Sequence, residues 1–300
     1  MRKPDPEYVK VIRMRKEHDE YTYKWEEDCG KLLKITKSSL GTFGFCPASY
    51  KYSYLEDIRQ ATSPAMIKGT IIHNAQEEFW KMVDVDKARE IAGRPGNYNT
   101  MVLQKHFRGL YPEAPEEDYE DIYRAMTAYN TERFIECIEE ESVDNFVPVG
   151  NEIMLNARYT TEDGQVVHLQ GIIDRIFYED GGYIPMELKT GAWKDSKKTM
   201  MRKEMAFYKL LFEHATDEDI IAAGLDPNIP FTHWGWYYPA SNYVLVEPVK
   251  KRSETAVIKG IQDLIEAYEN GVFPTKYFYK TCSFCSFFNI CEAANQESWV

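Results

Sequence analysis

Three residues in the middle of the chain, Asp174, Glu187 and Lys189, have the types and spacing needed for metal-assisted hydrolysis of a phosphodiester. Two facing carboxylates repel each other, and a hard divalent cation such as Mg²⁺ removes this repulsion while leaving positions for water and phosphate. Because side chains alternate along a strand, Lys189 shares the face of Glu187 and can direct its ammonium at the same phosphate or water. These residues are therefore the first candidates for a catalytic site.

The same stretch predicts the element that brings the two carboxylates together. Apolar runs at 172–178 and 183–189 flank Asp180-Gly181-Gly182, a turn signal between segments of high β-propensity. If Tyr178 pairs with Tyr183, the antiparallel register places the two carboxylates opposite each other, with Cβ atoms about 5 Å apart. A β-hairpin would thus build the site.

The alternative is an exposed charged ribbon whose lysine forms an ordinary salt bridge. The apolar content of both strands opposes this interpretation, because it is typical of buried strands, in which charged groups need partners or a metal. Pro185, inside the second strand, indicates a bulge or a sheet edge near the site. The apolar residues are Ile172, Ile173, Ile176, Ile184, Met186 and Leu188.

The first strand carries the pattern G-x-x-D-R from Gly171, and the second carries E-x-K-T-G from Glu187. Together these patterns resemble the PD-(D/E)XK nuclease superfamily, specifically its RecB-like branch. The resemblance implies an α/β fold in which a central mixed β-sheet of the restriction-endonuclease-like type is flanked by helices.

Two further motifs of that family have counterparts in this chain. The family's G-x-x-x-H helix, whose histidine is a metal ligand, matches Gly69 to His73. Its Q-x-x-x-Y helix corresponds to Glu204 and Tyr208, with glutamate in place of glutamine. Residues four apart share a helix face, so Glu204 and Tyr208 can contact one DNA strand, and the glutamate can add a third carboxylate near the metal.

Taken without the family, His73 has a more ordinary interpretation. A lone histidine beside an apolar helix stripe is most often a core or boundary residue. Ser63-Pro64 predicts the N-cap and first position of that helix, and Gly69, one turn before His73, permits a close approach to the backbone. The predicted apolar stripe comprises Ile72, Ala75, Phe79 and Met82.

Three of the six cysteines, Cys282, Cys285 and Cys291, form a C-x2-C-x5-C pattern near the C-terminus. This spacing is too short for independent disulfides but suits thiolates that converge on one metal centre. Cys46 is the best candidate for a fourth ligand. The metal would then clamp a helical region that joins the N- and C-terminal segments.

This cysteine distribution resembles that of the iron–sulfur RecB-like exonucleases, namely AddB-type nuclease domains and the CRISPR-adaptation exonucleases, in which the cysteines hold a 4Fe–4S cluster. A four-cysteine zinc site stays open as the alternative, because the spacing does not separate the two. The remaining cysteines, Cys29 and Cys137, are predicted to be ordinary buried thiols.

The composition is that of a folded protein from a reducing compartment. With 300 residues and 44% hydrophobic content, the chain can form one large domain, and wholesale disorder is excluded. No apolar run reaches membrane-spanning length, and the N-terminus lacks the apolar region of a signal peptide, so we expect a cytoplasmic protein of a prokaryotic or phage-infected cell. The chain contains no G-x-x-x-x-G-K-[ST], so any unwinding is expected from a separate helicase.

The net charge of −12 is unusual for a protein that binds DNA, but phosphates respond to the local field rather than to the sum. Basic residues are concentrated directly after Lys189. A solvated charged loop is the simpler interpretation, whereas the position beside the site favours a track for DNA phosphates. These residues are Lys194, Lys197, Lys198, Arg202 and Lys203.

The predicted layout is a single domain over residues 1–300. It comprises a charged arm (1–33), a helical region with Cys46 and His73 (34–145), a nuclease core (146–250) and a C-terminal helix with the cysteine cluster (251–300). Helices are predicted within 34–56 and at 64–83, 117–142, 199–214 and 253–269, with an irregular connection at 84–116. Strands are predicted at 151–159, with Glu152 as a further acid, and at 166–178, 183–189, 232–238 and 243–249.

From these features we expect a metal-dependent deoxyribonuclease, most simply an exonuclease on single-stranded or frayed DNA ends that leaves 5′-phosphates and 3′-hydroxyls. In this interpretation His73, Asp174 and Glu187 hold Mg²⁺ or Mn²⁺, and Lys189 orients the attacking water. One alternative is a non-catalytic DNA-end-binding or assembly subunit of a recombination, CRISPR-adaptation or phage replication complex. The other is a nuclease on RNA or a structure-specific endonuclease.

Overall fold

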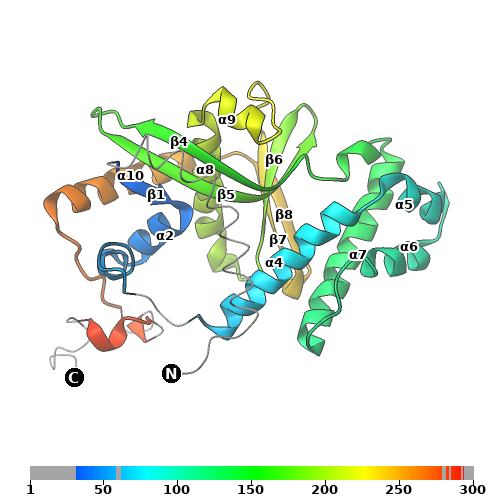
Figure 1. Ribbon diagram of the computed structural model, residues 1–300, viewed down its shortest axis with the longest axis horizontal. Helices are drawn as coiled ribbons and strands as arrows, with labels where there is room; N and C mark the ends of the chain where they lie inside the picture. Colours follow the sequence, from blue (N-terminus) through cyan, green and yellow to red (C-terminus); the bar gives the residue numbers. More distant parts are fainter. Residues whose placement is uncertain (1–31, 59–61, 279–281, 284, 292, 294–300) are drawn as a thin grey trace.

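The structure, a computed structural model, describes residues 32–58, 62–278, 282–283, 285–291 and 293. It contains a six-stranded mixed sheet with helices on both faces (Figure 1). This arrangement confirms the predicted α/β class. Residues 1–31 of the predicted charged arm, including Cys29, lie outside the described residues.

The long strand β5 organises the sheet. β4 lies antiparallel along one side of β5, while on the other side β1 pairs with residues 168–170 and β6 with residues 175–179. β6 continues the sheet through a parallel pairing with β7, which pairs antiparallel with β8. The strands are β1 (Lys34–Thr36), β4 (Gly150–Thr160), β5 (Val166–Glu179), β6 (Gly182–Leu188), β7 (His233–Tyr238) and β8 (Tyr243–Pro248).

Two layers of helices cover the two faces of the sheet. α2, α8 and α10 bury their apolar residues in one core with Tyr183 of β6, whereas α4 to α7 form a second core with the alternate residues Ile184, Met186 and Leu188. The helices are α2 (Lys37–Phe45), α3 (Pro47–Tyr50), α4 (Pro64–Met82), α5 (Val85–Ala92), α6 (Thr100–Arg108), α7 (Glu117–Glu139), α8 (Lys198–His214), α9 (Asp217–Ala222) and α10 (Lys251–Asn270).

The start of α4 follows the prediction, and its apolar stripe is confirmed at Ile72, Ala75 and Phe79 but not at Met82. Ser63 accepts a hydrogen bond from the Met66 amide, and Pro64 occupies the first turn. Met82, predicted to be in the stripe, is 61% exposed, whereas Trp80 is buried. Beyond Phe79 the buried face continues through Trp80 and the partly buried Val83. The helical repeat of 3.6 residues turns Met82 away from this face.

The secondary structure predicted for two segments was wrong. The connection at 84–116 forms α5, a small hairpin of β2 (Gly93–Arg94) and β3 (Asn97–Tyr98), and α6. The turn signals there were real but belong only to the short hairpin. Residues 34–56 form β1, α2, α3 and a π-helical turn (Lys51–Leu55) rather than one helix, since a three-residue strand gives no sequence periodicity.

Pro185 lies in the interior of the sheet, so the predicted edge is wrong, but a bulge is present beside it. In the parallel pairing with β7, Tyr183 lies opposite Phe231 and Met186 opposite Gly235, so three steps along β6 match four along β7. Because proline has no amide hydrogen to donate, the ladder tolerates the extra β7 residue at this point.

Candidate active site

The hairpin has the predicted register. Asp180 and Gly181 both have positive φ, at 50° and 76°, as a two-residue type I′ turn requires. Tyr178 pairs with Tyr183, and the ladder runs to Arg175 opposite Met186. One further step of the same register sets Asp174 opposite Glu187.

A third carboxylate, Glu152, extends this row onto β4. Asn151 pairs with Arg175 and Ile153 with Ile173, so Glu152 lies at the position opposite Asp174. Glu152 adopts φ 51°, a left-handed conformation that is uncommon for a non-glycine residue and is found preferentially at functional sites. Adjacent strands β4, β5 and β6 therefore each contribute one acid to a single row.

His73 completes a group that can hold a divalent cation. One ligand atom from each of His73, Glu152 and Asp174 lies within 4.8 Å of the others, and His73 Nδ1 is 3.6 Å from Asp174 Oδ2. Nitrogen and carboxylate oxygens are a donor set that suits Mn²⁺ and, through the oxygens, Mg²⁺. The close approach predicted at Gly69 is to Thr190, whose Oγ1 lies 3.5 Å from where a Cβ would stand.

The electrostatics of Glu152 fit a cation site. Burial, together with the carboxylates of Asp174 and Glu77, raises the pKa of Glu152 to about 8. A proton therefore compensates the clustered negative charge when no cation does. A bound cation would replace that proton.

Glu187 has a different environment from the one predicted. It is 3% exposed, and its Oε1 accepts a hydrogen bond from Lys189 Nζ at 2.8 Å and another from Lys37, while Tyr208 donates to Oε2 at 2.9 Å. Burial alone would raise the pKa of Glu187, but Lys37 and Lys189 hold it well below the usual range of a glutamate. Glu187 thus stands next to the cation group as a carboxylate with both oxygens hydrogen-bonded.

The predicted pair on α8 does face the site. Glu204 Oε2 lies 2.8 Å from Lys189 Nζ, and Tyr208 is buried against Glu187. Both residues therefore position Lys189 and Glu187 through direct contacts. Whether they also contact DNA stays a prediction.

Sequence reasoning missed Lys37 and gave Glu152 only as an additional acid. Lys37 begins α2 and reaches Glu187 from 150 positions away, and no spacing pattern links it to the hairpin. Glu152 was detectable because it lies on the strand just before the hairpin. Its place opposite Asp174, however, depends on a register that only the fold defines.

The basic stretch after Lys189 divides into two groups. Arg202 forms a two-pronged ion pair with Glu247 at 2.5 and 2.6 Å, and Lys197 donates to the Ala192 carbonyl at 2.6 Å. These two side chains are engaged within the protein. Lys194 and Lys203 are exposed, and Lys198 is half-buried.

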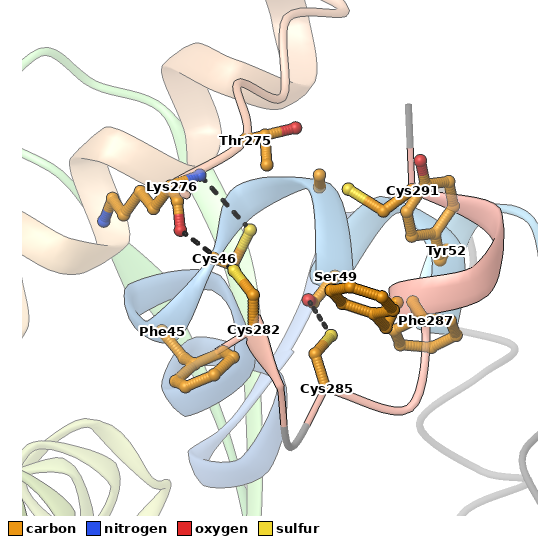
Figure 2. A pocket seen from close by; sticks show the side chains of 12 residues that line it. Phe45, Cys46, Ser49, Tyr52, Thr275, Lys276, Cys282, Cys285, Phe287 and Cys291 are labelled. Atoms are coloured by element: carbon orange, nitrogen blue, oxygen red, sulfur yellow. Dashed lines mark hydrogen bonds between the residues drawn. The ribbon is translucent and has the colours of Figure 1, made fainter. Parts of the chain in front are cut away.

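Cys46 meets the three C-terminal cysteines around one cavity, as shown in Figure 2. Cys46 caps the end of α2, and its Sγ accepts a hydrogen bond from the Lys276 amide at 3.5 Å. The Phe278 amide donates to Cys282 Sγ at 3.4 Å, and Ser49 Oγ lies 3.8 Å from Cys285 Sγ. Amide donors aimed at sulfur favour thiolates, so the donor set fits a metal centre.

Cys137 lies apart from this cavity in the core formed by α4 to α7. Burial raises the pKa of the Cys137 thiol, which is typical of an unreactive structural cysteine.

The mixed sheet carries a row of acids with a lysine beside it, which makes this region a candidate metal site. The sequence profile of the PD-(D/E)XK nuclease superfamily matches residues 34–292, and the chain belongs to that superfamily. The superfamily comprises nucleases that generally use Mg²⁺ or Mn²⁺, and His73, Glu152 and Asp174 provide a candidate acidic metal site.

Other comparisons add little. The crystal structure of SSO0001 is similar at 16% identity with a TM-score of 0.35, and the match covers 76% of this chain and 97% of the other. No curated protein matches the sequence. Among the described residues, no helix has the length and apolarity to cross a membrane.

Proposed function

We propose that this protein is a deoxyribonuclease of the RecB-like branch, and specifically an exonuclease that acts on single-stranded or frayed DNA ends. The observation that carries the proposal is the row of Glu152, Asp174 and Glu187 across three adjacent strands, with Lys189 in contact with Glu187. A pure scaffold has no physical need to bring these charges together, because their mutual repulsion opposes folding.

His73, Glu152 and Asp174 would hold Mg²⁺ or Mn²⁺, with Glu187 as the neighbouring acid. Such an ion, when bound, lowers the pKa of water and neutralises phosphate charge. Groups of the protein itself orient the acid and the reacting water. The Leu188 amide fixes Asp174 through a 2.8 Å hydrogen bond to Oδ2, and Lys189, 27% exposed at its side chain, can donate to the attacking water or to a phosphate oxygen.

The reaction that this arrangement supports is hydrolysis of one phosphodiester bond. The water oxygen bonds to phosphorus, the bond from phosphorus to the 3′-oxygen breaks, and the departing 3′-oxygen takes up a proton. The products are a 5′-phosphate and a 3′-hydroxyl. Lys189 stabilises the extra negative charge on the phosphate oxygens during this step.

We further propose that Cys46, Cys282, Cys285 and Cys291 hold a 4Fe–4S cluster with a structural role. A single zinc ion bonded at about 2.3 Å would require sulfurs within about 4 Å of one another. Among the described residues, no three cysteines have Sγ atoms that all lie within 4.8 Å of one another. The four cysteines instead surround a shared cavity. The separation of these sulfurs, rather than the size of the cavity, favours a multi-atom cluster over one ion.

The function is tested with purified protein and end-labelled single-stranded DNA, double-stranded DNA and RNA, each with Mg²⁺ or Mn²⁺. We expect stepwise shortening of single-stranded DNA from an end. Cleavage of circular single-stranded DNA would show endonuclease activity, preferential RNA cleavage would change the substrate class, and absence of any metal-dependent cleavage would contradict the proposal.

A further inference from the structure

Lys37 follows directly after β1, which shares one side of β5 with β6. β1 pairs with β5 at residues 168–170 and β6 pairs with it at 175–179, so in the described ladder residues 171–174 lie between the two partners on that side. The chain leaves β1 at Thr36 and begins α2 at Lys37. Thr36 and Ser39 cap the helix reciprocally, which fixes the direction in which Lys37 starts.

Lys37 reaches the same two carboxylates as Lys189. Its Nζ contacts Glu187 Oε1 and lies 3.7 Å from Glu204 Oε2, and it also stands 4.8 Å from the centroid of the Tyr208 ring. Its side chain is 19% exposed, against 3% for Glu187. The Lys37 side chain is therefore partly exposed to solvent, whereas the carboxylate is almost fully buried.

These contacts occupy both oxygens of Glu187. A carboxylate offers about four acceptor positions, of which two ammonium groups and the Tyr208 phenol already use three. A divalent cation near Asp174 would also repel the ammonium of Lys37. One acceptor position stays open, but because of this repulsion direct cation binding by Glu187 is favoured when Lys37 withdraws. Lys37 is less exposed than Lys189, but it lies at the first position of α2, outside the hairpin that constrains Lys189.

We propose that Lys37 is a second active-site lysine: it pairs with Glu187 while no cation is bound, is displaced when a divalent cation enters, and then contacts a phosphate of bound DNA. This role rests on the proposed nuclease function. In this role cation entry and phosphate binding are coupled, because the Lys37 ammonium that leaves Glu187 becomes available to a phosphate oxygen beside Lys189.

The displacement step is tested by Mn²⁺ binding without DNA, followed by the electron paramagnetic resonance signal of free Mn²⁺. Lys37→Met and Lys37→Gln should each bind Mn²⁺ about tenfold more tightly than the wild type, because the competing charge-assisted hydrogen bond is gone. Lys37→Arg, which can hold the carboxylate with two hydrogen bonds, should bind no more tightly than the wild type. Lys34→Met, at an exposed lysine three residues earlier on β1, is the matched control and should leave Mn²⁺ affinity unchanged.

Unchanged or weaker Mn²⁺ binding by both neutral variants would overturn the displacement. The phosphate contact is tested by single-turnover cleavage at saturating Mn²⁺, where Lys37→Met should be about 100-fold slower. Tighter Mn²⁺ binding with an unchanged cleavage rate would overturn the phosphate contact. If the wild type cleaves no nucleic acid, the nuclease proposal fails, and with it the phosphate contact, while Mn²⁺ binding still decides the displacement.

Discussion

Asp174 is held in place by a backbone amide: Leu188 donates a 2.8 Å hydrogen bond to its Oδ2 across β5 and β6. Glu187, its cross-strand neighbour, is instead held by two lysines and a tyrosine. The two acids of the hairpin are therefore unequal. Asp174 is oriented toward His73 and Glu152, whereas Glu187 is the anion of a buried ion-pair cluster.

This difference predicts opposite effects on stability. Glu187→Gln leaves two partly buried ammonium groups without their main counter-ion and should lower the free energy of unfolding by about 3 kcal/mol. Asp174→Asn keeps the hydrogen bond from Leu188 and removes repulsion with Glu152, so its stability should equal or exceed that of the wild type. Urea unfolding without divalent cations measures both, and equal destabilisation by the two substitutions would contradict the assignment.

Glu152 should make the ion-free protein sensitive to pH. Its pKa is about 8 in the folded state and about 4.5 in the unfolded state, so the folded state binds more protons between these values. Stability should fall as pH rises from about 4.5 to about 8, and Glu152→Gln should weaken this fall. Unfolding measured from pH 5 to 9 in chelator tests this, and an unchanged pH profile in the variant would exclude Glu152 as the cause.

The cysteine cavity should contain iron. Protein purified without oxygen should be brown, with about four irons and four sulfides per chain. Cys46→Ala should lose the iron and lower stability, because Cys46 is the one proposed ligand outside the C-terminal segment, whereas Cys137→Ala should keep the iron. One tightly bound zinc in a colourless protein would replace the cluster, and a metal-free wild type would remove the centre.

Cys46 also ends the helix that Lys37 begins. Loss of the metal centre in Cys46→Ala should therefore disturb Lys37 and change Mn²⁺ affinity in the same direction as Lys37→Met. This links the cysteine cavity to the active site through one short helix.

The exposed lysines after the site should contribute to DNA binding independently of the engaged ones. Lys194→Glu with Lys203→Glu should reduce the slope of log affinity against log salt by at least roughly 0.7 for each lost contact with single-stranded DNA. Lys87→Glu, an exposed lysine on α5, is the control. An unchanged slope in the double variant would mean that Lys194 and Lys203 are merely solvated.

The hairpin could be predicted because its register depends on local chemistry. A two-residue turn with two positive φ values and a clear β pattern on each side determines which residues face each other. His73 followed from a helix start at Ser63-Pro64 and a family spacing. Neither step required knowledge of how distant segments pack.

The rest of the site depends on tertiary contacts that leave no periodic signal. Lys37 enters between β1 and β6, and β1 is too short to be detected from sequence. Arg202 looked like a phosphate ligand because it lies in a basic run, but its partner Glu247 comes from β8. The sequence shows where charged residues are concentrated, but not which of them form ion pairs in the fold.

The most direct test of the whole account is metal-dependent cleavage by the wild type and Asp174→Asn, compared on 5′-labelled single-stranded DNA with saturating Mg²⁺ or Mn²⁺. Asp174→Asn keeps its backbone hydrogen bond but loses the charge that the cation requires, so we expect a folded protein whose cleavage is at least about 1000-fold slower. If folded Asp174→Asn retains most of the wild-type rate, the row of acids on β4, β5 and β6 is not the active site.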